Sequence, residues 1–145
     1  MKALLQIRPF LEADQGAVVA LWQRCGLLRP WNDPGKDIAR KLRVQRDLFL
    51  VGTLEDVIVG SVMAGYEGHR GWINYLAVDP QQRRAGLGRA LMDEAERRLR
   101  ALGCPKINLQ IRKDNLVATA FYAGIGFAED AALSFGKRLE SDEKS

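Results

Sequence analysis

Apolar residues in the stretch 87–102 recur with the period of an α-helix that buries one side. They stand three or four positions apart, at Leu87, Leu91, Ala95, Leu99 and Leu102. The opposite side carries acidic residues four positions before basic ones, in the pairs Asp93/Arg97, Glu94/Arg98 and Glu96/Arg100. This pattern predicts an amphipathic helix with its charged side in water.

A nearly unbroken apolar and aromatic run, residues 72–78, precedes that helix. Asp79-Pro80 ends the run, because proline cannot donate to a strand ladder and restricts the residue before it. Two further apolar runs, residues 48–53 and 57–66, are separated by a short turn and predict an antiparallel hairpin. We therefore expect a central strand that leads through a loop into the long helix.

The N-terminal part predicts one strand and two helices. Residues 4–8 are typical of an edge strand. Asp14 is placed to cap the first helix and Gly26 to end it, and Asp33-Pro34 opens the second helix by the cap-then-proline rule. The residues expected to face inward from the two helices are Val18, Leu21, Trp22, Cys25, Ile38 and Leu42.

The C-terminal part predicts a strand, a short helix and a hairpin. Residues 106–112 alternate as a strand. Asn115 opens the short helix and Gly126 ends it, and the residues expected to face inward are Val117, Ala118 and Phe121. Residues 127–130 and 133–139 predict a final hairpin, followed by a charged tail whose last few residues are expected to be frayed.

The order of these elements predicts an α/β or α+β sandwich with a mixed sheet: strand, two helices, three strands, helix, strand, helix and final strands. The chain has 145 residues and no internal break in composition, so it predicts a single domain, 1–145, large enough to bury a real core. No repeat, linker or low-complexity segment divides it.

Composition and charge narrow the kinds of function. Cys25 and Cys104 are the only cysteines and the chain has one histidine, so neither a zinc site nor a disulfide framework is expected. The net charge of +4 favours a small anionic ligand over nucleic acid, which would need a broader basic face. No apolar run approaches about 20 residues and the N-terminus has too short an apolar part for a signal peptide, so a cytoplasmic protein without membrane contact is expected.

The loop before the long helix combines glycines with arginines: Arg83, Arg84, Gly86, Gly88 and Arg89. Free N–H groups and the macrodipole at a helix start favour an anion there, glycines let a ligand approach the backbone, and arginines neutralise phosphate. A plain turn with solvated arginines is the alternative interpretation. The loop lacks the Gly-Lys-Ser/Thr of a P-loop, and Leu91 stands where the dinucleotide fingerprint needs a third glycine or alanine.

Two motifs, Arg83-x-x-Gly86-x-Gly88 and residues 115–127, place glycines and aromatic residues at fixed spacings. The first resembles the acyl-CoA pyrophosphate loop of the GNAT (GCN5-related) N-acetyltransferase superfamily. The second, residues 115–127, resembles Asn-x-x-Ala-x-x-Phe/Leu-Tyr-x-x-x-Gly-Phe, although taken alone it is also typical of a capped core helix. Both motifs and all the elements follow the family's order. The resemblance implies a mixed, mostly antiparallel sheet with helices on both faces and a splayed central strand pair.

The resemblance implies direct transfer of an acetyl group from acetyl-CoA, without a metal, to a primary amine. The pyrophosphate would lie on Arg83, Arg84, Ala85, Gly86, Leu87, Gly88 and Arg89. The pantetheine would pair with the strand edge at Leu76, Ala77 and Val78. A backbone N–H near Ala77 would hold the thioester oxygen, and Asn115 would contact the cofactor or orient the helix start.

Tyr122 matches the family tyrosine that hydrogen-bonds or protonates the departing thiolate. Reference pKa values near 10 for tyrosine and 8.5 for a thiol make full proton transfer uphill by roughly 2 kcal/mol, which favours a hydrogen-bonding role. The general base stays open, because Trp72 stands where some relatives carry a glutamate; the candidates are Glu67, His69 and Tyr75, directly or through water. Glu67 is assigned as catalytic with Tyr122, and solvated turn residues are the alternative interpretation of Glu67 and His69.

Residues 27–34 and 65–71 resemble, within the family, the small bacterial YpeA-type acetyltransferases. The first stretch lies where the family's acceptor loop usually falls, so Arg29, Trp31 and Asn32 are expected to shape the acceptor pocket; alternatively, Trp31 packs the two helices together. The expected acceptor is a protein N-terminus, an amino acid or a small amine, and a monomer or homodimer is expected. A non-catalytic acyl-CoA-binding or regulatory module of the same fold is the alternative function.

Overall fold

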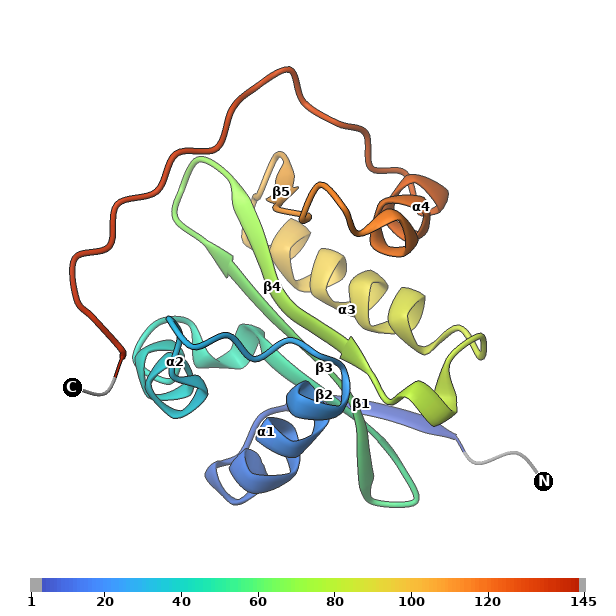
Figure 1. The fold of residues 1–145 in the computed structure, drawn as a ribbon. Coiled ribbons are helices and arrows are strands. Elements are labelled where there is room, and N and C mark those ends of the chain that lie inside the picture. The colour runs from blue at the N-terminus through green and yellow to red at the C-terminus, as the bar shows by residue number, and fades with distance from the viewer. Residues whose placement is uncertain (1–3, 144–145) are drawn as a thin grey trace.

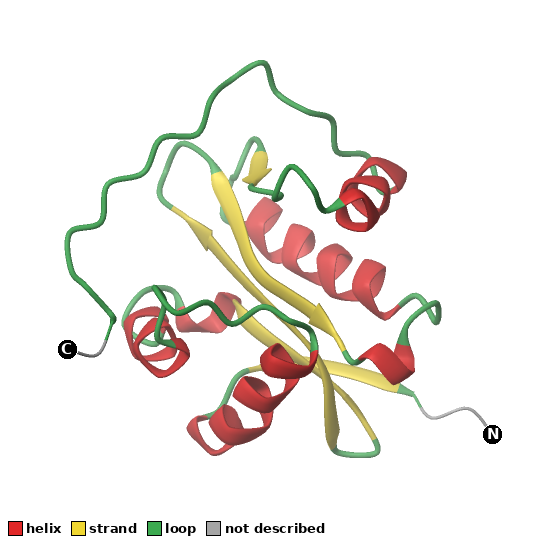
Figure 2. Cartoon of the chain, in the orientation of Figure 1, coloured by secondary structure: helices red, strands yellow, loops and turns green. Residues whose placement is uncertain are grey.

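A computed structural model describes residues 4–143 and contains one five-stranded sheet (Figures 1 and 2). Its strands lie side by side in sequence order: β1 (Leu5–Pro9), β2 (Phe49–Leu54), β3 (Val57–Tyr66), β4 (Gly71–Val78) and β5 (Ile107–Leu109). The first four strands pair antiparallel, and β4 pairs with β5 in parallel. The prediction of a mixed, mostly antiparallel sheet is therefore confirmed.

Helices cover both faces of this sheet. The α-helices are α1 (Gln15–Arg24), α2 (Pro34–Lys41), α3 (Leu87–Ala101) and α4 (Leu116–Gly124). Short 3-10 turns are η1 (Glu12–Asp14), η2 (Arg46–Leu48) and η3 (Pro80–Gln82). Figure 1 shows α1 and α2 on one side of the sheet and α3 and α4 on the other. Up to α4, the order of elements is the one predicted.

Each face of the sheet buries its own apolar cluster. One cluster includes Trp22 of α1 and Phe49 of β2, and the other includes Leu50 of β2 and Leu91 of α3. Phe49 and Leu50 are neighbours that serve opposite faces, because successive side chains of a strand alternate. The helix α3 approaches the sheet closely at Gly60, where a Cβ would lie 2.7 Å from Leu91 Cδ1. The sheet is thus packed on both sides around the strands that support β4.

The two predicted helix caps differ in what the aspartate binds. Asp33 accepts the N–H of Lys36 at 3.0 Å, so it caps α2 as predicted. Asp14 also occupies the N-cap position, of α1, but its carboxylate binds Arg8 at 2.7 Å and the N–H of Leu11 at 2.8 Å. Asp14 therefore ties the end of β1 to the helix start instead of capping the helix N–H groups.

A β-bulge in β4 separates that strand from β5. The register of β3 and β4 shifts next to the pair Ser61–Ala77, and Tyr75 on the bulged strand has a φ of 52°. The strand β5 pairs only with residues 71–73. On its β5 side, residues 74–78 have no strand partner within the described chain. This is the splayed central strand pair that the family resemblance implies.

The final hairpin predicted for residues 127–130 and 133–139 is wrong. Beyond α4, residues 125–143 contain no helix or strand and run back across the molecule to α2 (Figure 1). Leu133 and Phe135 alternate as in a strand, but they pair with no strand among residues 4–143, and Phe135 is 88% exposed. Alternation predicts a strand only where a neighbouring strand can accept its hydrogen bonds.

Three smaller expectations are also corrected. Leu102 is 50% exposed because it lies just beyond the end of α3. Val117 is 81% exposed in the first turn of α4, whose packing on the core comes from residues further along, such as Phe121. The strand predicted for residues 106–112 has only three residues, because β4 and β5 diverge after Ile73.

Candidate active site

The start of α3 leaves a set of backbone N–H groups without partners. The first helical hydrogen bond runs from Ala90 N to Gly86 O at 3.0 Å. The N–H groups of Leu87, Gly88 and Arg89 therefore have no acceptor in the helix. Gly86 occupies the N-cap position and has no side chain to accept from them. These donors are available to a ligand.

The two glycines of this loop have different structural roles. Gly86 has a φ of 78°, a left-handed conformation that is costly for other residues, and no atom lies within 4 Å of the position its Cβ would take. Gly88 lies in the first turn of α3, where a Cβ would stand 3.3 Å from Phe121 Cζ. Gly86 therefore shapes the turn, whereas Gly88 lets α4 pack against the start of α3.

Arg83, Arg84 and Arg89 surround the helix start with exposed guanidinium groups. None of them forms an ion pair with a carboxylate of residues 4–143. The one carboxylate of the loop, Asp79, pairs with Arg24 at 3.0 Å. Unneutralised cations beside free N–H groups at a helix start are suited to a phosphate or pyrophosphate.

The open edge of β4 supplies further donors next to this loop. Asp79 N donates to Val59 O at 2.8 Å, so Asp79 faces β3. Because successive residues of a strand direct their N–H and C=O groups to opposite sides, Ala77 also faces β3, while Leu76 and Val78 face the gap. Of the three residues predicted to hold pantetheine, Leu76 and Val78 thus direct their N–H groups into the gap, and Ala77 supports the strand from behind. The Val78 carbonyl is already occupied, because it accepts from Cys25 Sγ at 3.3 Å and from Arg83 Nε at 3.4 Å.

A cavity of about 750 Å³ opens beside this edge of β4. Its walls come from the α1–α2 connection, from β4, from the chain after β5 and from α4. The predicted site residues that line it are Arg29, Trp31, Asn32, Leu76, Asn115 and Tyr122. The structure therefore brings the predicted acceptor loop, strand edge and second motif to one space. The Arg83 loop lies outside this lining, at the C-terminal end of β4.

Tyr122 lines the cavity from α4. Its ring packs edge-on against Phe121 and Phe127, with ring centroids 5.1 and 5.6 Å away. This burial raises the pKa of Tyr122 to about 12. Within the described chain the hydroxyl groups of Tyr66 and Tyr75 each donate a hydrogen bond, whereas that of Tyr122 donates none. Tyr122 is thus a protonated phenol with a free hydroxyl group.

Asn115 caps α4, because its Oδ1 accepts the N–H of Ala118 at 3.0 Å. It also lines the cavity. The capped-helix interpretation of the second motif is therefore correct as far as the backbone goes, and it leaves the amide Nδ2 of Asn115 available to a ligand. Contact with a cofactor stays a prediction.

Contacts to both the backbone and the side chain of Tyr75 hold the bulge in place. Trp22 Nε1 donates to Ser61 Oγ at 2.9 Å, and Ser61 Oγ donates to the Tyr75 carbonyl at 2.8 Å. The Tyr75 ring stacks on Trp22 at 3.8 Å, and its hydroxyl donates to Asp37 Oδ2 at 2.6 Å. Burial and the Asp37 carboxylate raise the pKa of Tyr75 well above its usual range. Tyr75 therefore fixes the bulge and is not available as a general base.

Sequence reasoning missed the partners of Tyr75. Ser61 was the one available signal, as a hydroxyl in the middle of an otherwise apolar strand. Asp37 belongs to a helix that gave no sign of facing the site, since its position relative to β4 depends on how α2 packs. These residues position the bulge and do not belong to any short motif.

The structure does not bring Glu67 and His69 to the cavity. Both are exposed in the turn between β3 and β4. The Glu67 carboxylate accepts the N–H groups of Arg70 and His69, and these bonds lower the pKa of Glu67. A lower pKa makes the carboxylate a weaker base. The assignment of Glu67 as catalytic finds no support, and the alternative of turn residues accounts for both side chains.

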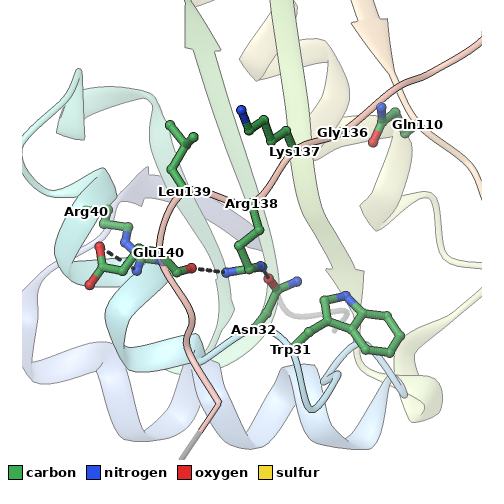
Figure 3. Close-up of a pocket in the computed structure, with 9 residues that line it drawn as sticks. All are labelled: Trp31, Asn32, Arg40, Gln110, Gly136, Lys137, Arg138, Leu139 and Glu140. Atoms are coloured by element: carbon green, nitrogen blue, oxygen red, sulfur yellow. Dashed lines mark hydrogen bonds and ion pairs between the residues drawn. The ribbon is translucent and has the colours of Figure 1, made fainter.

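A second cavity, of about 770 Å³, adjoins the first beneath residues 131–143, which we call the C-terminal strap (Figure 3). The two cavities share Trp31, Asn32, Arg40 and Gln110. Lys137 and Arg138 of the strap line the second cavity, and Arg138 donates to the Asn32 side chain. The Arg112 guanidinium lies over the Trp31 ring, 5.5 Å from its centroid. Trp31 is thus a wall of both cavities, 43% exposed, instead of a packing residue between two helices.

Asp142 fixes the end of the strap, within the charged tail whose last few residues were expected to be frayed. Its fully buried side chain accepts from Arg40 at 2.7 and 3.1 Å and from Asp33 N at 3.0 Å. These bonds, above all that from Arg40, hold the pKa of Asp142 well below its usual range. Arg40 also binds Asp37 at 3.2 Å, which in turn holds Tyr75. The last two residues of the tail lie outside the described chain.

Residues 11–127 match the family model described as Acetyltransferase (GNAT) family. The chain is also 47% identical over 140 residues to an acetyltransferase, ECA0875, of Pectobacterium atrosepticum, covering 97% of this chain and 99% of that protein. The chain therefore belongs to the GNAT acetyltransferase family.

Solved structures resemble the fold over most of the chain. Ard1 of Thermoplasma volcanium is 29% identical, with a TM-score of 0.79 over 88% of this chain and 84% of that one. The ribosomal-protein-S18-alanine N-acetyltransferase of Escherichia coli is 25% identical, with a TM-score of 0.74 over 88% and 80%. AAC(6')-Iy, solved with a bisubstrate analogue containing CoA and acetylneamine, is 16% identical, with a TM-score of 0.77 over 94% and 100%. That last likeness concerns the fold alone.

Two further properties of the described residues bear on the site. Residues 4–143 contain no group of three or more His, Cys, Asp or Glu side chains placed to hold a metal ion. None of the helices in this range is long and apolar enough to cross a membrane.

Proposed function

We propose that this chain is an acetyl-CoA-dependent N-acetyltransferase that transfers the acetyl group directly to a primary amine. The observation that carries the proposal is a continuous series of free hydrogen-bond donors on the surface of the site. It runs from the N–H groups at the start of α3, along the open edge of β4, to a cavity with the free hydroxyl of Tyr122. Such a path suits a long ligand with phosphates at one end and a thioester at the other.

The backbone supplies most of the contacts to acetyl-CoA in this proposal. The pyrophosphate binds the N–H groups of Leu87, Gly88 and Arg89, with charge from the arginines at 83, 84 and 89. The pantetheine amides pair with Leu76 and Val78, which act as the edge of a strand that lacks its neighbour. The fold is compatible with this ligand, since AAC(6')-Iy, which shares the fold, was solved with a CoA-containing analogue.

The chemistry is addition of a neutral amine to the thioester carbon, followed by cleavage of the C–S bond; the nitrogen, which becomes positively charged on addition, releases its extra proton to water. The carbonyl oxygen gains negative charge in the first step, and the free N–H of Leu76 or Val78 is the donor type that stabilises it. In the second step the sulfur leaves as a thiolate and accepts a hydrogen bond from Tyr122. With the pKa of Tyr122 at about 12, full proton transfer to a thiolate of reference pKa 8.5 is uphill by about 5 kcal/mol. Tyr122 therefore acts as a hydrogen-bond donor.

Among the described residues, no carboxylate that lines the first cavity is free to act as a general base. This limits the kind of acceptor amine that can react. Asp37, which lines the first cavity, is occupied by Tyr75 and Arg40. An acceptor must then arrive with its amine already neutral or lose a proton to water. At pH 7.5 about a third of α-amino groups with a pKa near 7.8 are neutral, against about one lysine in a thousand. This favours an α-amine, consistent with the N-acetyltransferase relative that acts on an alanine.

Acceptor-dependent release of free CoA thiol from acetyl-CoA tests the proposal. Binding of acetyl-CoA is followed in parallel by calorimetry on the same protein. Release with at least one amine establishes the transferase. Tight binding without release for any α-amine, amino acid, polyamine or aminoglycoside would favour a non-catalytic acyl-CoA-binding module, and no binding at all would refute the assignment of the Arg83 loop.

A further inference from the structure

The acceptor side of the molecule carries more positive charge than its own carboxylates neutralise. The cations that line the two cavities are Arg29, Arg40, Lys41, Arg112, Lys137 and Arg138. The carboxylates that line them are Asp37 and Glu140. Acetyl-CoA phosphates do not account for this excess, because the Arg83 loop that suits them lies outside both cavities.

The nearby carboxylates are already paired. Asp37 and Glu140 lie 3.2 and 3.6 Å from the Arg40 guanidinium. Asp142, behind the wall, lies 2.7 Å from Arg40 and 3.8 Å from Arg138. The lining cations that form no ion pair with the described residues are Arg29, Lys41, Arg112 and Lys137.

In two of these four cations, Arg112 and Lys137, the charged group donates no hydrogen bond to residues 4–143. Arg29 donates to the carbonyls of Gly26 and Leu28, so part of its guanidinium serves its own loop. Burial disfavours the charged form of Lys41 and lowers its pKa. Arg112 only stacks over Trp31, and Lys137 donates no hydrogen bond within residues 4–143. Their donors are free for a ligand.

Resting on the proposed function, we propose that the acceptor amine carries a carboxylate close to it, and that the free cations on either side of Trp31 attract this carboxylate: Arg112 in the first cavity and Lys137 in the adjoining second cavity. The Arg112 guanidinium, positioned over the Trp31 ring, keeps its N–H groups unpaired, and the planar fork of a guanidinium suits a carboxylate. The lysine on the strap adds a second charge without a fixed geometry. The amine would then point from the cationic side of the cavity toward the edge of β4 and Tyr122.

The same charges act against polycationic acceptors. An aminoglycoside or a polyamine carries several ammonium groups, and placing them beside unpaired guanidinium and ammonium groups is repulsive in a partly desolvated cavity. The likeness to AAC(6')-Iy is therefore a likeness of fold that does not extend to its acetylneamine-containing ligand. The carboxylate itself belongs to a free amino acid or to an acidic residue next to a peptide N-terminus.

Matched acceptors that differ in one charge test the proposal. We would compare alanine with alaninamide, and the capped peptides Ala-Glu-Ala-amide and Ala-Gln-Ala-amide, with spermidine and neamine as polycations. Preference for the carboxylate member of either pair by about tenfold or more in kcat/KM is expected. Amine basicity cannot produce this result, because a neighbouring carboxylate raises the pKa of an amine and leaves less of it neutral. The pair that responds identifies the source of the carboxylate.

Variants that each remove one positive charge test whether Arg112 and Lys137 cause the preference for carboxylate acceptors. Arg112→Gln and Lys137→Gln are each expected to lower kcat/KM for the carboxylate acceptor about tenfold and to leave the amide acceptor and the KM for acetyl-CoA unchanged. Lys113→Gln is the matched control, because Lys113 is an exposed neighbour that lines neither cavity. Equal loss for both members of a pair, or a raised KM for acetyl-CoA, would overturn the assignment of these residues.

The result also separates this inference from the proposed function. Thiol release that is faster with spermidine or neamine than with any carboxylate acceptor would refute the carboxylate site while establishing the transferase. Release with no acceptor, despite binding of acetyl-CoA, would refute the proposed function and this inference with it. Equal rates for acid and amide would leave a transferase without a carboxylate site.

Discussion

The cofactor half and the acceptor half of this site are built from different parts of the chain. Along β4 and at the start of α3, the donors are backbone N–H groups, and the side chains add charge or shape the turn. On the acceptor side, the cavity walls are side chains from the α1–α2 connection, the chain after β5 and the C-terminal strap. Backbone donors follow from secondary structure and are expected to tolerate side-chain changes. Side-chain walls depend on the distant segments that carry them.

Replacing Tyr122 with phenylalanine is expected to have the largest effect on turnover, because Tyr122 lies where the cofactor half meets the acceptor half. It removes the hydrogen bond to the departing thiolate, so kcat should fall about 100-fold while the dissociation constant of acetyl-CoA stays unchanged. Steady-state kinetics and calorimetry measure the two quantities. Tyr66→Phe is the matched control, because the Tyr66 hydroxyl binds Gly68 in the exposed turn. Equal loss of turnover and affinity would assign Tyr122 a structural role.

Substitutions of Gly86 and Gly88 test the separate roles of these two glycines in the cofactor half. Gly88→Ala places a Cβ against Phe121, and the resulting shift at the start of α3 should weaken acetyl-CoA binding about tenfold. Phe121→Leu makes room for the Cβ, so the double variant should recover most of the affinity. Gly86→Ala strains a left-handed backbone by about 1 kcal/mol, and Phe121→Leu should not rescue it. Rescue of both variants, or of neither, would contradict the two separate roles.

Loosening the strap should affect the acceptor half alone. Asp142→Asn removes the charge that holds Arg40, so the acceptor KM is expected to rise about fivefold, with the affinity for acetyl-CoA unchanged, because the wall carrying Lys137 is displaced. Faster amide hydrogen exchange across residues 131–143 would report the loosening independently. Glu143→Gln is the control, since Glu143 is exposed beside the anchor. Unchanged exchange and kinetics would mean that the strap is positioned by other contacts.

Acid should loosen the same anchor, with the smallest effect. The pKa of Asp142 is lower in the folded chain than the usual value of about 3.9. Its contribution to stability is therefore fully present above pH 4 and is lost as the pH falls through the lowered value. Urea unfolding of the wild type and Asp142→Asn should differ at pH 7 and 5 and converge in strong acid. A difference that persists unchanged at pH 2 would show that the ion pair does not stabilise the fold.

The same contrast explains how much was predictable from the sequence. The strands β2 to β4, the helix α3 and the Arg83 loop were predictable, because periodicity, proline and glycine act locally. Tyr122 and Asn115 followed from a motif within one helix. The hairpin after α4 was predicted wrongly, since Leu133 and Phe135 alternate but have no strand beside them in the described chain.

The remaining acceptor residues depend on contacts between distant segments. Asp142 is 102 residues from Arg40 in the sequence, so no local pattern connects them. Glu67 was chosen for its residue type, but its carboxylate serves its own turn. Arg29, Trp31 and Asn32 do line the cavity, and what they bind remains a prediction.

The buried anchor at Asp142 has a practical consequence for handling the protein. The buried Asp142 carboxylate, paired with Arg40 of α2, keeps in place the strap that forms one wall of the acceptor cavity. An affinity tag or fusion partner joined directly behind this sequence would therefore act on that wall and distort acceptor kinetics, while acetyl-CoA still binds normally. A tag placed before β1, removed by protease before assay, keeps the acceptor side in its own geometry.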